Sequence, residues 1–464
     1  MIQAVEDKRH TKEQILIFLA ISCQFITGSN FYSINNYLKI SEGVFGNQLD
    51  STQWVVFCFF GRLLGVCILG KYAERFGFFK SMHVVSGLFV TFTTLFLFFC
   101  FMHHSFPVTD ERFYLFRLYH CFLEPAALFL PYIYLFNKIP SSNHFITGAY
   151  LVFGVFLGKV ATYGLKFIQA VYPTGWAVIP VITTLLAWGI YGYLQMTSLK
   201  NLSTDAAIIT TKPFKIPIPL KVKTLSLLLG AACATAIFYN HTFLSHYMHD
   251  IAVIDPRFNI SGVLYYSLWV LCLIPGVKLT EYFGFLKVAR CSLIGLVILT
   301  FNPFFTHCPP VIYPTCQVVF AICSAFFVAP LLAVLHKLYT PYPSTFHRMF
   351  WYVFGFGLCI LFAFFEKTLA FQQGYSGLGW CVFSASLGLC LLALLLEDSN
   401  CEKGFLNVGK ETNKRIKQNI DPSLDLPASA GVSSILGVLE VSDTSDTSRA
   451  MLTPSDQHIN QQTN

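Results

Sequence analysis

Residues 70–80 read GKYAERFGFFK and lie between two long apolar runs. A closely related stretch, EYFGFLK, occupies residues 281–287, and it also lies between two apolar runs. The two copies are 207 residues apart, measured from Glu74 to Glu281. A charged, glycine-bearing turn that returns once in this way indicates two similar halves joined in one chain, a pattern typical of secondary transporters.

The composition points to a membrane protein with many spans. Of the 464 residues, 55% are hydrophobic and only 12% are charged, whereas an ordinary soluble domain carries roughly 25% charged residues. The basic residues fall in short loops rather than on one face, so nucleic acid is not an expected partner. The polar start, residues 1–10, leads directly into a full-length apolar run, so we expect no removable signal peptide.

Twelve apolar stretches approach the length of about 20 residues that a membrane span needs. A polar gap separates the sixth from the seventh, which divides the chain into six plus six. The predicted spans are 14–34, 52–70, 81–102, 113–136, 145–168, 175–194, 222–245, 261–279, 288–306, 312–335, 347–366 and 378–396. The predicted domains are a cytoplasmic N-terminus (1–13), a first six-helix half (14–194), a central cytoplasmic loop (195–221), a second six-helix half (222–397) and a disordered cytoplasmic tail (398–464).

Lysine and arginine placement predicts the orientation, because cytoplasmic loops of membrane proteins are enriched in these residues. With both termini in the cytoplasm, the basic residues alternate correctly between the two sides of the membrane along the whole chain.

The high phenylalanine content and the short loops look bacterial, so we expect the inner membrane. The tail is rich in Ser, Thr, Asp, Asn and Gln, a composition typical of disorder.

A second repeat supports the first. It lies after the fourth and the tenth spans, and each pair of residues in it is 201 positions apart. The first copy is Pro140, Phe145, Tyr150 and Val152-Phe153-Gly154, and the second is Pro341, Phe346, Trp351 and Val353-Phe354-Gly355.

The stretch from Gly70 to Lys80 resembles the loop between spans two and three of the major facilitator superfamily. The family pattern is G-x-x-x-D-R/K-x-G-R/K-R/K, repeated between spans eight and nine. Here Glu74 replaces the usual aspartate, Phe78 and Phe79 replace basic residues, and Tyr282 replaces the basic residue beside Glu281. The resemblance covers residues 14–397. It implies an all-α membrane fold with twelve helices in two pseudo-symmetric halves, which needs no second subunit.

The chain also loosely resembles the proline/betaine (metabolite:proton) symporters of that superfamily. This likeness rests on Arg117 and on the segment from Pro140 to Gly158 with its three glycines, Gly148, Gly154 and Gly158.

The repeated motif has a physical reading of its own. Gly77 and Gly284 permit a tight turn that other residues resist. Glu74, Arg75 and Lys80 are placed to pair with neighbouring helix ends and to hold a cytoplasmic gate closed. The alternative is that these residues only anchor the chain at the membrane surface. The predicted gate residues are Gly70, Glu74, Arg75, Gly77, Lys80, Glu281, Gly284 and Lys287.

Ionisable residues at membrane depth are functional candidates, because each costs at least about 2.5–3.5 kcal/mol to insert. The first half holds Arg62, Arg117, Glu124 and Lys159 in its spans. The spacing of Arg117, His120 and Glu124 places them on one helical face. We expect a central polar site whose surplus positive charge suits a carboxylate, with Glu124 exchanging a proton and His120 as its possible partner. The alternative is that Glu124 only neutralises Arg117 or Arg62.

The spans of the second half contain almost no charge. Asn240 and Trp269 are candidates there for contact with the solute. Gln24 is comparable in span one, which the family resemblance implies to line the cavity.

We therefore expect a secondary active transporter, not an enzyme, that moves a small zwitterionic or carboxylate solute by proton-coupled uptake. Amino acids, betaine-like osmolytes and organic acids are not separable from the sequence. The alternatives are efflux of an amphipathic compound and a non-transporting receptor or scaffold that kept the fold. No Walker-type glycine loop and no metal-ligand spacing such as C-x-x-C occurs, so no cofactor and no metal are expected. The expected partners are the solute, protons and the lipid bilayer.

Overall fold

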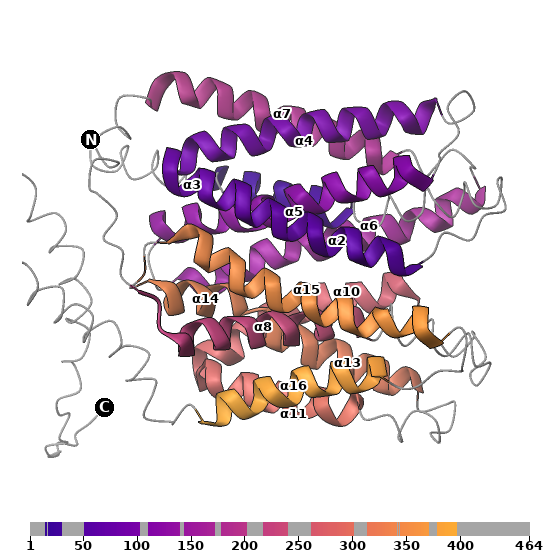
Figure 1. Ribbon diagram of the computed structural model, residues 1–464, viewed down its shortest axis with the longest axis vertical. Coiled ribbons are helices and arrows are strands. Elements are labelled where there is room, and N and C mark those ends of the chain that lie inside the picture. Colours follow the sequence, from indigo (N-terminus) through magenta and orange to yellow (C-terminus); the bar gives the residue numbers. More distant parts are fainter. Residues whose placement is uncertain are drawn as a thin grey trace, which may run out of the picture. The chain divides into compact units, whose positions relative to one another are not determined.

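The computed structural model describes a set of helical segments, and within them every regular element is a helix (Figure 1). All of them belong to one unit, Met1–Gly409. Asn240 and the predicted tail lie outside the described residues. The described residues are 14–15, 17–29, 51–102, 110–139, 143–171, 178–201, 217–239, 261–300, 313–340, 342, 344–370 and 378–396.

Each of the twelve predicted spans contains a described helix. The first half holds a helix at Ile17–Ser29, α2 (Ser51–Gly65), the π-helical turn η1 (Val66–Gly70), α3 (Lys71–Phe76), α4 (Phe78–Phe101), α5 (Asp110–Lys138), α6 (His144–Val171) and α7 (Val178–Asn201). The second half holds α8 (Leu220–Phe238), α10 (Gly262–Phe283), α11 (Phe285–Thr300), α13 (Tyr313–Val328), α14 (Leu331–Tyr339), α15 (Thr345–Ala370) and α16 (Leu378–Leu396). The predicted second span thus continues through η1 into α3, and the tenth is divided between α13 and α14.

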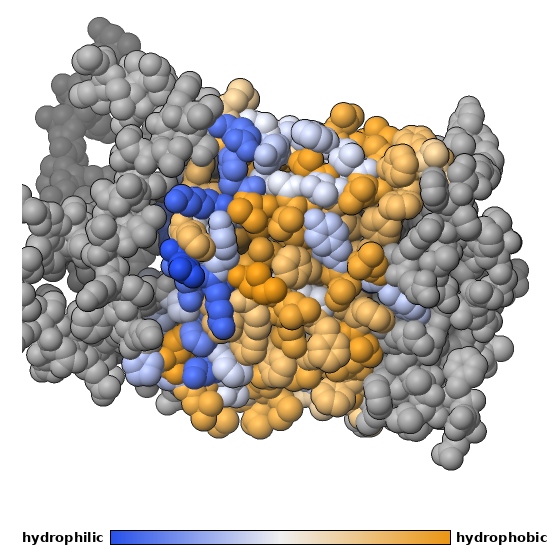
Figure 2. Space-filling view, turned by 45° about the horizontal axis from the view of Figure 1, so that its top comes forward, coloured by the Kyte–Doolittle hydropathy of each residue, from blue (hydrophilic) through white to orange (hydrophobic). Residues whose placement is uncertain are grey.

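The chain is an integral membrane protein. In the described part, 8 helices are long and apolar enough to cross a membrane, and two shorter apolar helices accompany them. Figure 2 shows a broad apolar band on one face, with hydrophilic side chains gathered at the end where α3 and α14 lie. We call this end of the bundle, defined by α3 and α14, the motif end. Large apolar side chains such as Leu271 and Leu115 are more than half exposed, as expected of residues that face lipid.

The two repeated glycines make the same turn. Gly77 has φ 83° and separates α3 from α4, and Gly284 has φ 85° and separates α10 from α11. Side chains other than glycine rarely adopt this conformation. The prediction of a tight turn at both positions is confirmed. The charged residues before each glycine are helical rather than in a loop, so the turn is one residue long.

The second repeat marks two equivalent close helix contacts. A Cβ on Gly154 of α6 would lie 2.6 Å from the carbonyl oxygen of Ile21 in the first helix. A Cβ on Gly355 of α15 would lie 2.0 Å from the carbonyl oxygen of Leu227 in α8. Small residues let helices approach closely in membranes. The repeat therefore encodes the same packing of span five on span one in the first half, and of span eleven on span seven in the second.

The two halves contact each other through two main pairs of helices, α2 with α15 and α6 with α10. Each pair takes one helix from each half. In Figure 1 the helices of the first half lie on one side of the bundle and those of the second half on the other. Aromatic rings join both pairs. The ring centroids of Phe59 and Phe354 lie 6.2 Å apart in the first pair, and those of Phe156 and Trp269 lie 4.2 Å apart in the second.

Candidate functional site

A cavity of about 120 Å³ lies between the halves. Its lining comes from the first helix, α2, α5 and α6 on one side and from α8, α13, α14 and α15 on the other. The charged residues in the lining are Arg62, Glu124 and Lys159. The rest of the lining is mostly aliphatic and aromatic. Three of the ionisable residues that the sequence singles out are therefore brought to one cavity.

Arg62 and Glu124 form a two-point ion pair within the first half. The Arg62 Nε atom donates to Glu124 Oε2 at 3.0 Å, and a terminal nitrogen donates to Oε1 at 3.2 Å. The two side chains are 5% and 20% exposed. The Arg62 guanidinium also lies 5.4 Å from the ring centroid of Phe356 in the second half. Of the two arginines that could neutralise Glu124, the structure selects Arg62.

Lys159 lies in an aromatic enclosure. Its Nζ atom is 4.9 Å from the ring centroids of both Phe156 and Tyr266, and 5.7 Å from that of Phe238. Phe156 belongs to the first half, whereas Tyr266 and Phe238 belong to the second. Ring faces attract a cation, most strongly where water is excluded, and Lys159 is only 5% exposed. The rings therefore stabilise a buried ammonium at the boundary between the halves.

Arg117 and His120 lie on α5 outside the cavity lining. Both are fully buried, and the His120 ring lies 5.7 Å from that of Phe92 in α4. The ligand atoms of His120, Cys121 and Glu124 lie within 4.8 Å of one another, close enough for a metal ion. Arg62 already binds both oxygens of Glu124, and two arginines near this cluster oppose a cation. We therefore assign no metal to it.

Gln24 has a structural contact that the sequence did not predict. Its Nε2 atom donates to the carbonyl oxygen of Ala127 at 2.9 Å. Pro131 lies inside α5 and has no N–H to donate to the carbonyl four residues earlier. That carbonyl belongs to Ala127, so the glutamine replaces the missing helix donor. Gln24 is fully buried and is not part of the cavity lining.

Trp269 supports the cavity wall without lining it. Its side chain is fully buried and stacks on Phe156, which does line the cavity.

The aromatic residues around the cations are the part of the site that the sequence did not indicate. The chain contains 48 phenylalanines, and their number conceals the few that line the cavity. The spacing of Phe156 and Lys159, three positions apart on α6, was the one available signal.

Glu74 joins the halves at the motif end. One carboxylate oxygen accepts from the backbone N–H of Phe346 at 2.9 Å and from the hydroxyl of Ser344, at the start of α15. A helix N-terminus carries partial positive charge and exposed N–H groups, so a carboxylate is stabilised there. In the other copy of the motif, Glu281 bonds to Lys278 of its own helix at 2.7 Å. The two copies share a turn but differ in what their carboxylates bind.

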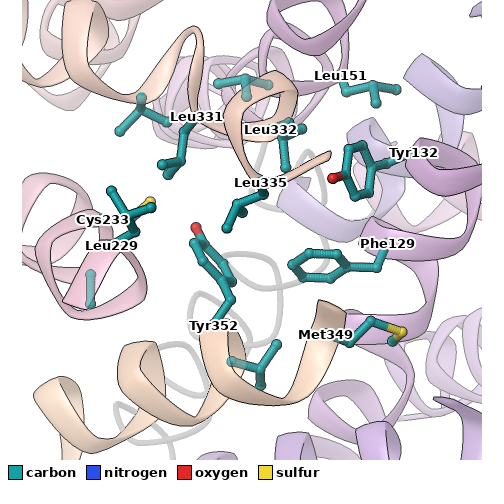
Figure 3. Packing of buried hydrophobic residues seen from close by; sticks show 14 of the residues in the cluster. Phe129, Tyr132, Leu151, Leu229, Cys233, Leu331, Leu332, Leu335, Met349 and Tyr352 are labelled. Carbon is teal, nitrogen blue, oxygen red and sulfur yellow. The ribbon is translucent and has the colours of Figure 1, made fainter. Parts of the chain in front are cut away.

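A layer of aromatic and histidine rings also connects the halves near this end. The ring centroids of His144 on α6 and His336 on α14 lie 5.0 Å apart. Figure 3 shows Phe129 and Tyr132 of α5 facing Leu335 of α14, with Tyr352 of α15 beside them. Phe129 and Tyr132 follow Glu124 by one to two helical turns, so this layer lies between the cavity and the motif end.

Comparison with known proteins identifies the fold. No family model matches the chain, and no curated protein matches it. Solved structures of XylE do match. A double-tryptophan mutant of XylE has a TM-score of 0.65 at 12% identity, covering 82% of this chain and 95% of that one. The proton:xylose symporter XylE bound to 6-bromo-6-deoxy-D-glucose has a TM-score of 0.60 at 12% identity, covering 83% and 95%. The inward open xylose transporter XylE from E. coli has 0.59 at 13%, covering 82% and 96%. The chain therefore has the major facilitator fold, as predicted from the repeated motif.

Proposed function

We propose that this chain is a secondary active transporter that moves a small carboxylate-bearing solute together with a proton, by alternating access. The observation that carries the proposal is the cavity between the halves, which holds two cations and one carboxylate. Transporters built from repeated halves bind their solutes at this place and rock the halves about it. XylE, which has the same fold, is described as a proton:xylose symporter.

The Arg62–Glu124 pair offers a physical route to coupling. Breaking a buried ion pair by neutralising one partner costs roughly 3–5 kcal/mol, because the other charge is left uncompensated. A proton that binds Glu124 therefore makes Arg62 available to the carboxylate of a solute. Proton and solute then stabilise each other in the cavity, and neither is expected to cross alone.

Glu74 would hold the motif end closed while the cavity faces the other side. In this proposal the motif end is cytoplasmic, both termini are cytoplasmic, and the protein works as a monomer in the bacterial inner membrane. The basic residues near Glu74, including Lys71, Arg75 and Lys80, support this orientation. The protein would act as a transporter rather than as an enzyme.

The test is solute uptake by reconstituted vesicles with an imposed pH gradient. The panel includes labelled amino acids, betaines, organic acids and xylose, and vesicles without protein give the passive leak of each weak acid. We expect one class of carboxylate to accumulate above that leak, and to stop accumulating when the gradient is dissipated. Extrusion driven by the gradient would favour efflux of an amphipathic compound. If nothing on the panel crosses in either direction, the transporter proposal is wrong and a receptor role comes forward.

A further inference from the structure

We propose that the cavity selects small monocarboxylates whose carbon skeleton is apolar, and that it rejects sugars and zwitterions. This inference rests on the proposed function, because it names the class of solute for the same site. It is narrower than the class expected from the sequence, which included amino acids and betaines.

The charge of the lining favours one negative group on the solute. Arg62 and Lys159 are the basic side chains of the lining, and Glu124 is its one carboxylate. When Glu124 takes up a proton, as proposed above, Arg62 loses the carboxylate counter-charge that it binds at both oxygens. A monocarboxylate replaces that counter-charge, whereas a neutral sugar leaves the guanidinium uncompensated in a largely apolar cavity. An uncompensated charge in such a space is costly.

The hydrogen-bonding groups of the lining do not suit a solute with many hydroxyls. The hydroxyl of Thr27 donates to the carbonyl oxygen of Cys23 at 2.9 Å, within its own helix. The hydroxyl of Tyr352 lies beside the thiol of Cys233, another residue of the lining, so the two polar groups face each other. Each sugar hydroxyl that enters without a partner loses its bond to water, at about 1–3 kcal/mol per group.

The ring faces that would attract a quaternary ammonium already hold cations. Lys159 lies against Phe156, Phe238 and Tyr266, and Arg62 lies over Phe356. The carboxylate of Glu124 is bound at both oxygens by Arg62. The ammonium of a betaine or an amino acid would therefore compete with Lys159 and Arg62 for the rings. The carboxylate of such a zwitterion would bind the cations no more tightly than the carboxylate of a simple acid.

The remaining wall provides an apolar surface for a carbon skeleton. Leu128 and Val152 line it from the first half, and Ile237, Leu331 and Val353 line it from the second. Burying a CH₂ group against such a wall is worth about 0.8 kcal/mol. The arrangement fits a solute with a carboxylate at the cations and a branched or aromatic body against the aliphatic residues.

The experiment measures ligand-induced shifts of the thermal unfolding midpoint of the purified full-length protein at pH 7. Benzoate and isovalerate are the probes, and benzyl alcohol, glycine betaine and xylose are the comparisons. We expect both acids to raise the midpoint in a saturable way, and the three comparisons to leave it unchanged. The proposal is overturned if neither acid raises the midpoint, if benzyl alcohol matches benzoate, or if betaine or xylose exceeds both acids.

Variants assign the effect to the cavity. Lys159→Gln should weaken benzoate binding at least tenfold, whereas Lys159→Arg should keep most of the affinity. Lys223→Gln is the matched control, because its Nζ atom also lies near a ring, 5.7 Å from the centroid of Trp351, but outside the cavity lining. Equal affinity in Lys159→Gln and Lys223→Gln would overturn the assignment. Gradient-driven transport of xylose would refute the solute class alone, whereas acid binding that depends on Lys159 without any transport would refute the proposed function alone.

Discussion

Glu74→Gln is expected to open the motif end, and Glu281→Gln is expected to leave it closed. The two glutamates occupy the same position in the two copies of the motif. Only Glu74 crosses between the halves, where it accepts from the backbone N–H of Phe346 and from the hydroxyl of Ser344. Glu281 bonds to Lys278 three residues earlier on an exposed face. The second glutamate is therefore an internal control for the first.

The size of the effect follows from these contacts. Hydrogen bonds to a charged group contribute roughly 1.5–3 kcal/mol and neutral ones about 0.5–1.5 kcal/mol. Glutamine keeps an acceptor oxygen but loses the charge at both bonds. Because this site is exposed and solvent screens the charge, the closed state should lose about 1 kcal/mol in total relative to the open state. This corresponds to about a fivefold change in the ratio of closed to open molecules. A helical pair three residues apart contributes only about 0.2–0.5 kcal/mol, so Glu281→Gln should change the ratio by about twofold or less.

The assay is a distance distribution between spin labels at positions 80 and 340. Lys80 and Thr340 are exposed residues at the motif end, one in each half. The labels should be attached to unnatural amino acids, because the chain has 15 cysteines of its own. We expect Glu74→Gln to increase the population at longer distances. An unchanged distribution in Glu74→Gln, or an equal change in Glu281→Gln, would refute the reasoning.

Two further predictions concern packing. Gln24→Leu should lower the stability of the protein by about 1–2 kcal/mol, because the carbonyl of Ala127 loses its donor inside the membrane; thermal unfolding in detergent measures this, and an unchanged midpoint would contradict it. Gly355→Ala should reduce the yield of folded protein, because its Cβ would meet the Leu227 carbonyl at 2.0 Å, whereas Gly388→Ala in α16 should fold normally, since it has open space around it. Size-exclusion profiles of the two alanine variants provide that comparison, and matching profiles would refute it.

The fold was largely predictable from the sequence. Membrane spans are set by length and hydropathy, and both repeats correspond to packing features that occur once in each half. Gly77 and Gly284 share a backbone conformation, and Gly154 and Gly355 share a close helix contact. The π-helical turn η1 was not predictable, because nothing in the apolar run of residues 66–70 distinguishes it from an α-helix.

The site was predictable only in part. Charge at membrane depth singled out Arg62, Glu124 and Lys159, and the structure places all three at one cavity. The sequence could not distinguish Arg62 from Arg117 as the partner of Glu124. That choice depends on how α2 and α5 are rotated against each other. The aromatic enclosure of Lys159 combines rings from three helices of two halves, and no local spacing encodes such an arrangement.

The measurement that tests the central claim most directly is proton movement driven by solute. Vesicles loaded with a pH-sensitive dye receive an inward solute gradient, without any imposed pH difference. The solute is the one that accumulates in the uptake panel, and vesicles without protein give the passive signal. We predict that the native protein acidifies the interior as solute enters, and that Glu124→Gln still exchanges labelled for unlabelled solute but moves no protons. Proton movement in Glu124→Gln equal to that of the native protein would contradict the account, because the carboxylate would then be only the counter-ion of Arg62.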